Sequence, residues 1–389
     1  MQIRSKLPDI GTTIFTTMSK MASDYNAINL GQGFPDFNAD AALLDLVTKS
    51  MQEGHNQYPM MTGVASLREV ISHKVHSLYG RLYDPNTQIT VTSGATEAIM
   101  SAVLSTVFQG DEVIVIEPCY DCYVPAIRLA GGIPVRVQMS APTSSQPFFA
   151  VDWNKVKSCV SSKTRMIIIN SPHNPTGSVF SEKDFEALEA IVNNTNIIVL
   201  SDEVYEHIVF DQKTHISVAS RPMLAERAFV ISSFGKTTHT TGWKIGYCCA
   251  PVALTTELRK VHQFVVFTVP SPFQHALAIY TKNPQTYLSL SNFYQEKREQ
   301  LIQGLAKTRF KTLPCPGTYF LLADYSEISK QSESEFSIWL AQEHGVVVIP
   351  VSAFYATPEH PDSNHNIVRF CFAKKESTLD QAIERLVKV

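Results

Sequence analysis

Lys236 is the residue whose position in this sequence most strongly indicates chemistry. It follows a short apolar run, Phe229–Ser232, which predicts a buried strand, and Gly235 predicts a turn that leaves Lys236 just beyond the strand's carboxyl end. In open α/β sheets, ligands bind at that edge. An amine in an apolar pocket or near other cations loses proton affinity and can form a Schiff base with an aldehyde. The commoner alternative for a lysine is an ion pair with a carboxylate.

Polar side chains follow two more predicted strands. Asn174 comes after Met166–Asn170, and Asp202 comes after Ile197–Leu200. The carboxyl ends of parallel strands meet at one sheet edge, so these side chains and Lys236 can converge on one ligand. A buried carboxylate is unfavourable unless a cation or a hydrogen-bond donor compensates it. A protonated heteroaromatic nitrogen would provide that cation.

A possible anion site precedes a predicted helix. Ser93-Gly94-Ala95-Thr96-Glu97 lies between a short strand, Ile89–Thr92, and a helix that starts near Thr96. Small residues at a helix N-terminus let backbone N–H groups close on a phosphate. An ordinary capping segment has the same composition. Ser233 and Lys244, on either side of Lys236, could add a hydroxyl and a cation, which favours phosphate.

The elements that must position these residues alternate along the chain from about Val91 to Ala250. Short apolar runs alternate with amphipathic segments such as Thr96–Phe108 and Glu182–Val192, a pattern that predicts a mostly parallel sheet covered by helices. The runs expected to be strands are Glu112–Glu117, Val135–Val137, Met166–Asn170, Ile197–Ser201, Phe229–Ser232 and Tyr247–Ala250.

After about Pro272 the pattern changes to that of a smaller α+β domain. The expected helices are Thr286–Ala306, Ser334–Glu343 and Leu379–Val387, and the expected strands are Thr318–Ala323, Val346–Ile349 and Ile367–Phe372.

Composition excludes several classes of protein. A net charge of −3 over 389 residues gives no reason to expect nucleic acid or a membrane surface as partner, and no apolar stretch approaches the length of a membrane span. We expect a cytoplasmic protein whose seven cysteines are reduced. Cys119 and Cys122 form a C-x-x-C pair, but no second pair completes a zinc site, so we expect no metal.

Taken together, these segments resemble the class I/II aminotransferases, which are fold-type-I pyridoxal-phosphate enzymes. The segments that carry the resemblance are Ser93–Thr96, Asn174-Pro175-Thr176-Gly177, Asp202-Glu203-Val204-Tyr205, Ser233–Lys236 and Gly242–Tyr247. Asn29–Phe37, Asn56-Gln57-Tyr58 and Tyr120–Tyr123 look closest to the branch of methionine and kynurenine aminotransferases, the latter including glutamine transaminase K.

The resemblance implies an α/β fold with a large domain, built on a mostly parallel helix-covered sheet, and a smaller α+β domain. The division it suggests is an N-terminal cap and part of the small domain at 1–43, a large cofactor-binding domain at 44–280, and a C-terminal small domain at 281–389. The bonds Glu117-Pro118 and Asn174-Pro175 match places where relatives often have cis peptides.

For the cofactor, the resemblance implies pyridoxal 5′-phosphate. Lys236 would form the Schiff base and shuttle the proton at the substrate Cα, while Asp202 would pair with the pyridine nitrogen. Tyr205 and Asn174 would hydrogen-bond the ring's O3′, and Tyr120 would stack on the ring. The expected phosphate ligands are Ala95, Thr96, Ser233, Lys244 and the partner subunit's Tyr58, so the enzyme should be a homodimer. Lys244 stands where many relatives have arginine, which replaces a bidentate contact with a point charge.

For the substrate, the resemblance implies that Arg369 binds the α-carboxylate as a fork, with help from Asn174 and Gly33. Its amino group would pass to a 2-oxo acid in ping-pong half-reactions. The expected specificity residues are Phe15, Tyr58, Tyr123 and Phe267. No second arginine matches the side-chain clamp of dicarboxylate-specific relatives, which favours methionine, other apolar or aromatic amino acids, and glutamine over aspartate.

Three other functions remain as alternatives. A cysteine-S-conjugate or cystathionine β-lyase would use the same lysine and cofactor but release pyruvate, ammonia and a thiol. Ser233-x-x-Lys236 also has the S-x-x-K spacing of serine acyl hydrolases, although the companion motifs of those enzymes are missing. A non-catalytic regulator built on the same fold would be expected to carry an additional basic helix-turn-helix.

Overall fold

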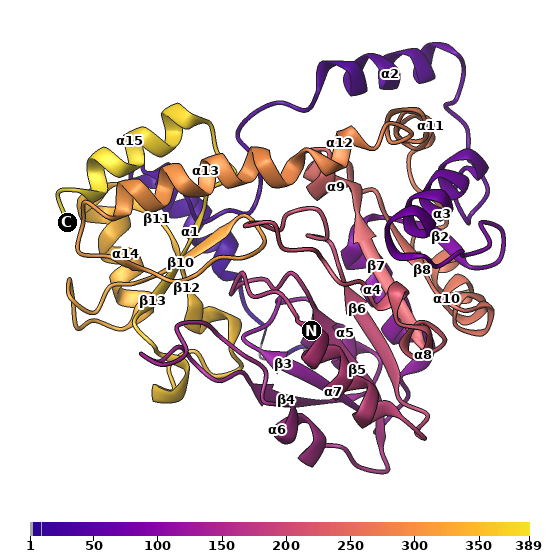
Figure 1. Cartoon of the computed structure of the whole chain (residues 1–389), viewed down its shortest axis with the longest axis horizontal. Coiled ribbons are helices and arrows are strands. Elements are labelled where there is room, and N and C mark those ends of the chain that lie inside the picture. The colour runs from indigo at the N-terminus through magenta and orange to yellow at the C-terminus, as the bar shows by residue number, and fades with distance from the viewer. Residues whose placement is uncertain (1–2, 9) are drawn as a thin grey trace.

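A computed structural model describes residues 3–8 and 10–389 of the chain. Two bodies are visible in Figure 1: a larger one around a central sheet, and a smaller one that contains the C-terminus. Helix α13 (Leu290–Leu305) runs from the larger body into the smaller one. Within the described residues, no helix is both long and apolar enough to cross a membrane.

The larger body is built on a seven-stranded sheet in the order β2-β8-β7-β6-β5-β3-β4. All neighbouring strands are parallel except at β8, which is antiparallel to both β2 and β7. The central strands are runs of β-branched and apolar residues that are buried throughout, as expected of a sheet covered on both faces. The bounds are β2 Ile89–Thr92, β3 Glu112–Glu117, β4 Ile133–Gln138, β5 Thr164–Asn170, β6 Ile198–Asp202, β7 Ala228–Ser233 and β8 Gly246–Cys249.

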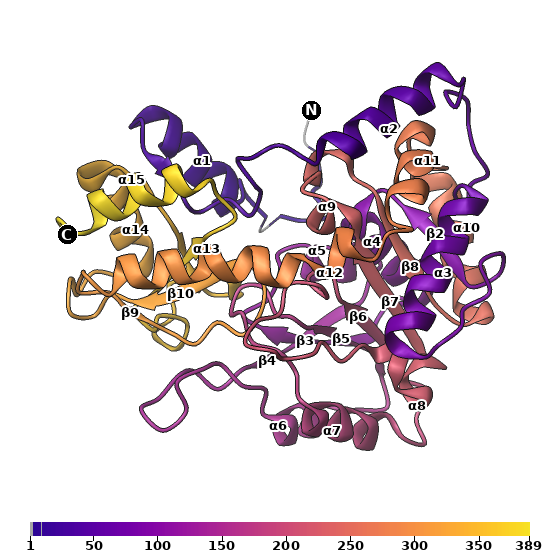
Figure 2. The same ribbon diagram turned by 45° about the horizontal axis from the view of Figure 1, so that its top comes forward.

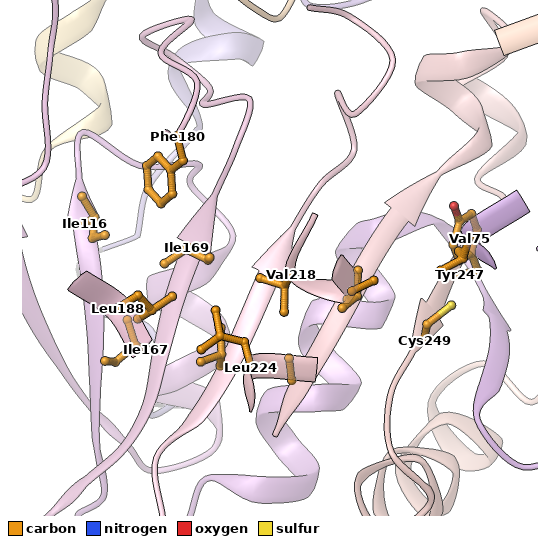
Figure 3. Close-up of a cluster of buried hydrophobic side chains, with 14 of the residues drawn as sticks. Val75, Ile116, Ile167, Ile169, Phe180, Leu188, Val218, Leu224, Tyr247 and Cys249 are labelled. Atoms are coloured by element: carbon orange, nitrogen blue, oxygen red, sulfur yellow. The ribbon is translucent and has the colours of Figure 1, made fainter. Parts of the chain in front are cut away.

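Helices cover both faces of this sheet. On one face, shown in Figure 3, Ile167 and Ile169 of β5 pack with Leu188 of α7, Leu224 of α8 and Val218. The helices of the large body are α2 Ala41–Gln52, α3 Ala65–Tyr79, α4 Gly94–Thr106, α5 Tyr123–Leu129, α6 Trp153–Ser158, α7 Glu182–Val192, α8 Pro222–Ala225, α9 Phe234–Thr237, α10 Val252–Val265, α11 Ser271–Tyr280 and α12 Gln285–Leu288. The other face is covered by α4, α5 and α10, whose Val103, Ile127 and Leu258 are buried.

The smaller body contains an antiparallel sheet in the order β12-β13-β10-β9 and a parallel pair, β1 with β11. The strands are β1 Ile28–Asn29, β9 Lys311–Thr312, β10 Phe320–Asp324, β11 Val346–Val347, β12 Ile349–Pro350 and β13 Ile367–Cys371. The helices with them are α1 Ile14–Asp24, α13, α14 Glu333–His344 and α15 Glu376–Leu386. Because β1 pairs with β11, the N-terminal segment joins this body, whereas α2 packs on α11 of the larger one (Figure 2). On the basis of these contacts, we propose the domain division 1–43, 44–280 and 281–389.

Two predicted elements differ from those observed. The single helix expected over Thr286–Ala306 is two helices, α12 and α13, which meet at Ser289, where the serine hydroxyl donates to the Gln285 carbonyl. The single strand expected over Val346–Ile349 is two strands, because β11 pairs with β1 and β12 pairs with β13. Apolar periodicity shows that such runs are buried but not which partner buries each half.

A buried ion pair links α3 to the turn that follows β6. Lys74 Nζ donates to Glu206 Oε1 at 2.7 Å, and Ser232 Oγ and Tyr79 Oη donate to the same carboxylate at 2.6 Å each. Burial alone would raise the pKa of Glu206, but Lys74 and the hydroxyl donors outweigh it and hold that pKa well below its ordinary value. The ion pair therefore stabilises the fold above the unfolded-state pKa of the glutamate, and this contribution is lost as the pH falls through the lower folded-state value.

We expect Lys74→Met to lower the free energy of unfolding by about 3–5 kcal/mol, because it leaves Glu206 buried without its cation. The matched control is Lys49→Met, which removes an exposed lysine 3.7 Å from Glu53 and should change stability by less than about 0.5 kcal/mol. Denaturant unfolding at one fixed protein concentration measures both. Equal effects of the two substitutions would contradict a stabilising role for the buried pair.

Candidate active site

The predicted functional side chains converge at the carboxyl ends of β5, β6 and β7. Asn170 lies opposite Asp202 in the register, and Asp202 lies opposite Ile231. The loops that leave these strands line a cavity of about 230 Å³. Its walls include Phe15, Gly33, Gly94, Ala95, Thr96, Tyr120, Asn170, Asn174, Asp202, Val204, Tyr205, Ser233, Gly235, Lys236, Thr241, Lys244, Phe320 and Arg369.

Lys236 lies in the one-turn helix α9, which starts directly after β7. Its Nζ donates to Tyr319 Oη at 2.8 Å and to the Gly33 carbonyl at 3.2 Å, and Tyr319 Oη also donates to that carbonyl at 2.6 Å. Burial lowers the pKa of Lys236 to about 8, and the positive charges of Lys244 and Arg369 act in the same direction. About a tenth of this amine is therefore neutral and nucleophilic at pH 7, far more than for a lysine with the ordinary pKa.

Asp202 is a buried carboxylate that has only neutral hydrogen-bond donors. Oδ2 accepts from Tyr123 Oη at 2.7 Å, and Oδ1 accepts from the Val204 N–H at 3.3 Å. Burial raises the pKa of Asp202 to about 6. Within residues 3–8 and 10–389, it forms no ion pair, so a ligand that brings a cationic group would complete the charge balance.

Arg369 joins the small body to this cavity. Nη1 donates to Asn174 Oδ1 at 2.6 Å and Nη2 to the Gly31 carbonyl at 3.1 Å, while the guanidinium lies 3.7 Å from the Phe320 ring centroid. Burial lowers the pKa of Arg369 to about 10, so it remains charged at neutral pH. Its Nε has no hydrogen-bond partner among the described residues. A guanidinium with a neutral amide partner and a spare donor is suited to a carboxylate.

The segment expected to bind phosphate has the required backbone. Helix α4 starts at Gly94, whose φ of 70° is in the left-handed region, so the N–H groups of Ala95 and Thr96 lie at a helix N-terminus facing the cavity. Gly246 of β8 packs against this turn so closely that an added Cβ would lie 2.7 Å from the Gly94 carbonyl carbon. Lys244 and Ser233 line the same cavity.

The expected cis peptides are both present, at Glu117-Pro118 and Asn174-Pro175. A third one, Ser171-Pro172, was not predicted. They lie in the loops that carry Tyr120 and Asn174, both of which line the cavity. Tyr205 also lines it, with its ring edge-on to that of Tyr319 at 5.2 Å.

The specificity residues expected from the sequence lie in different places. Phe15 lines the cavity. Tyr123 does not line the cavity. Its side chain is buried and hydrogen-bonded to Asp202, so it is not positioned to contact a substrate in the cavity. Tyr58 is 84% exposed and its ring lies 5.6 Å from that of Phe267, outside the cavity wall of this chain.

Sequence reasoning missed Tyr319 and Phe320, which come from one strand region of the small body. The segment was correctly expected to be a strand, but nothing in its spacing indicates that the Tyr319 hydroxyl reaches Lys236. Thr241, between Lys236 and Lys244, also lines the cavity. Its position between Lys236 and Lys244, two residues already expected to lie in the site, is the signal that could have identified it.

The geometry also tests two alternatives. Ser233 Oγ accepts from the Gly235 N–H, and the hydrogen bonds of Lys236 Nζ within the described residues go to Tyr319 and Gly33, so no serine–lysine acyl-transfer pair forms. Burial raises the pKa of both the Cys119 and the Cys122 thiols, which keeps them protonated and unreactive.

The sequence matches the family described as aminotransferase class I and II over residues 25–386, which is nearly the whole chain. The chain belongs to this aminotransferase family. Its lysine, aspartate and arginine converge in the cavity as the resemblance implied, and the cofactor of these aminotransferases is pyridoxal 5′-phosphate. The fold is the fold-type-I α/β architecture expected from the sequence.

Methionine and kynurenine aminotransferases are among the proteins to which this chain is similar. A methionine aminotransferase of Escherichia coli is 50% identical over 98% of this chain and 97% of its own. The solved structure of Escherichia coli YbdL, described as having a methionine aminotransferase function, superposes with a TM-score of 0.96 at 49% identity and covers 100% of both chains. A kynurenine–oxoglutarate transaminase of Dictyostelium discoideum is 35% identical over 97% of this chain and 94% of its own.

We expect the lowered pKa of Lys236 to set the pH dependence of this amine's reactivity in the aminotransferase from which the cofactor has been removed. Only a neutral amine reacts with an aldehyde, so reductive methylation of Lys236 should reach half its maximal rate near pH 8. Peptide mapping by mass spectrometry measures this rate for each lysine. Lys311 is the internal control, because Glu327 holds its pKa above the ordinary value and its rate should still be rising beyond pH 10. Parallel curves for the two lysines would contradict a perturbed Lys236.

Proposed function

We propose that this enzyme transfers the α-amino group of methionine, or of another apolar or aromatic amino acid including glutamine, to a 2-oxo acid. The observation that carries the proposal is the convergence of Lys236, Asp202 and Arg369 on one cavity. Together they provide a nucleophilic amine, an uncompensated carboxylate and a carboxylate-binding fork. The similarity to methionine aminotransferase supports the choice of donor.

The residues present fit pyridoxal 5′-phosphate. The α4 N-terminus at Ala95 and Thr96, with Ser233 and Lys244, would hold its phosphate, and Asp202 would hold its ring nitrogen. The aromatic ring of Tyr120, with Tyr205 and Asn174, would hold the ring and its O3′. When bound, the cofactor supplies an electron sink for the negative charge that develops at the substrate Cα.

The protein's own groups then orient the substrate and move one proton. Arg369, fixed by Asn174 and by the Gly31 carbonyl, would bind the α-carboxylate, with the Gly33 backbone beside it. Lys236 would take the proton from Cα, because its lowered pKa makes it a base near neutral pH. Tyr319 and the Gly33 carbonyl hold the Lys236 amine at the cavity and would keep it in reach of Cα.

The walls of the cavity favour an apolar side chain. Phe15 and Phe320 line the cavity, with ring centroids 5.5 and 3.7 Å from the Arg369 guanidinium, and Phe354 also packs against that guanidinium at 4.8 Å. Arg369 is the only arginine among the described residues that line the cavity. A second carboxylate on the substrate would therefore be buried without a guanidinium partner, which is unfavourable.

We also propose a homodimer in which the partner subunit's Tyr58 reaches the phosphate and the partner subunit's Phe267 closes the substrate pocket. In the single chain, exposed apolar side chains gather around this segment: Tyr58, Met60, Phe264 and Phe267 are 84%, 70%, 86% and 44% exposed. Such a patch is typical of an interface. A cytoplasmic location is part of the same proposal, in keeping with seven cysteines that are all free.

An amino-donor panel with a common 2-oxo acid acceptor tests the proposed substrate class. We expect kcat/KM for methionine to exceed that for aspartate by at least about 100-fold, because aspartate would leave a carboxylate unpaired. Phenylalanine, leucine and glutamine should fall between them. If aspartate is the best donor, the assignment of the side-chain pocket is wrong.

The dimer has its own test. Phe264→Asp puts a charge into the proposed interface, so we expect monomers by analytical ultracentrifugation and weaker binding of pyridoxal phosphate, since Tyr58 is lost from the site. Phe108→Asp is the control, because Phe108 is 65% exposed but lies before the amino end of β3, at the opposite end of the sheet. A Phe264→Asp protein that remains dimeric would contradict this interface.

A further inference from the structure

Contact with a substrate does not explain the position of Tyr123. It is the first residue of α5, only 2% exposed, and absent from the cavity wall. Its hydroxyl donates a 2.7 Å hydrogen bond to Asp202 Oδ2. The side chain expected to contact substrate therefore reaches the site only through Asp202.

Tyr123 makes the shortest hydrogen bond to the Asp202 carboxylate, and among the described residues it is the only side-chain donor to it. The main-chain carbonyl of Asp202 is held separately, by Asn170 Nδ2 at 2.8 Å and by the Ser171 N–H at 3.2 Å. The backbone is thus fixed by β5, whereas the direction of the carboxylate depends on Tyr123.

Tyr123 itself is held by its neighbours. Its N–H donates to the Tyr120 carbonyl at 3.3 Å, and the two rings meet edge to face at 5.8 Å. The rest of its ring packs in the apolar cluster between the sheet and α4. Tyr120 faces the cavity while Tyr123 lies behind it, so a one-turn segment presents one aromatic ring to the ligand and one hydroxyl to the carboxylate.

We infer that Tyr123 is a positioning residue, which holds Asp202 so that its carboxylate can pair with the protonated ring nitrogen of pyridoxal phosphate. The inference rests on the proposed function of Asp202. It gives Tyr123 a role in cofactor electronics and none in choosing the amino-acid side chain.

The electrostatics agree with this geometry. Burial raises the pKa of Asp202 and the Tyr123 hydrogen bond lowers it. The other charged or titratable groups that interact with this carboxylate are Lys236, Glu203, Cys122, Tyr120 and Tyr205. Burial also raises the pKa of Tyr123 far above its ordinary value, so its hydroxyl stays protonated and remains a donor. Without that hydroxyl, the carboxylate loses its best donor and is more easily protonated, and a protonated acid pairs poorly with a cationic nitrogen.

The test compares two ligands on two proteins. Dissociation constants of wild type and Tyr123→Phe are measured by fluorescence for pyridoxal phosphate and for its 1-deaza analogue, in which carbon replaces the ring nitrogen. The ratio of the two constants isolates the contribution of the ring nitrogen. We expect Tyr123→Phe to reduce the wild-type preference for pyridoxal phosphate by at least about 10-fold, the lower end of the usual contribution of a hydrogen bond to a charged group, and to bind the analogue almost unchanged.

Tyr83→Phe is the matched control, because Tyr83 is fully buried and its hydroxyl has no partner among the described residues. It should leave the ratio unchanged. In Tyr123→Phe, equal weakening of both ligands would show a packing role, and unchanged binding of both ligands would show no role. The ratio keeps its wild-type value in both cases, and either result overturns the inference alone. A wild-type protein with no preference for the ring nitrogen would overturn the role of Asp202 and that of Tyr123 with it.

Discussion

The site depends on the register of three parallel strands. Asn170, Asp202 and Ile231 lie side by side across β5, β6 and β7, so the loops that carry Asn174 and Lys236 leave the sheet at one edge. Successive strand side chains point to opposite faces, so a slip of one residue in β6 would move Asp202 to the other face of the sheet. Apolar packing on both faces prevents that slip. The hydrophobic core thereby fixes the relative positions of the carboxylate and the amine.

Within this frame, the site holds charges that its own residues leave only partly compensated. Asp202 and Arg369 are buried with neutral partners, and Lys236 bonds to a hydroxyl and a carbonyl. Buried charges of this kind are unfavourable by themselves, in contrast to the paired Lys74 and Glu206 behind the sheet. A ligand with a cationic ring, an anionic phosphate and an amino-acid carboxylate relieves all of them, and its binding should therefore stabilise the folded enzyme.

Much of this could be predicted from the sequence, because strand runs followed by Asn174, Asp202 and Lys236 show which polar groups share an edge. Arg369 could be assigned only through resemblance, since a strand arginine is also compatible with a solvent-facing position. The roles of Tyr319 and Tyr123 could not be predicted, because they depend on how β10 and α5 pack in three dimensions. Tyr58 and Phe267 lie outside the cavity of one chain, and the homodimer that we propose would bring both to the site.

The most direct test of amino transfer at Lys236 is a half-reaction. The enzyme loaded with pyridoxal phosphate is mixed with methionine in the absence of a 2-oxo acid, and the keto acid released is counted by mass spectrometry. One equivalent per active site is expected, with the amino group retained until an acceptor is added, because each half-reaction stops without its partner substrate. Continued release of keto acid with ammonia and a thiol, without any acceptor, would contradict transamination and indicate elimination.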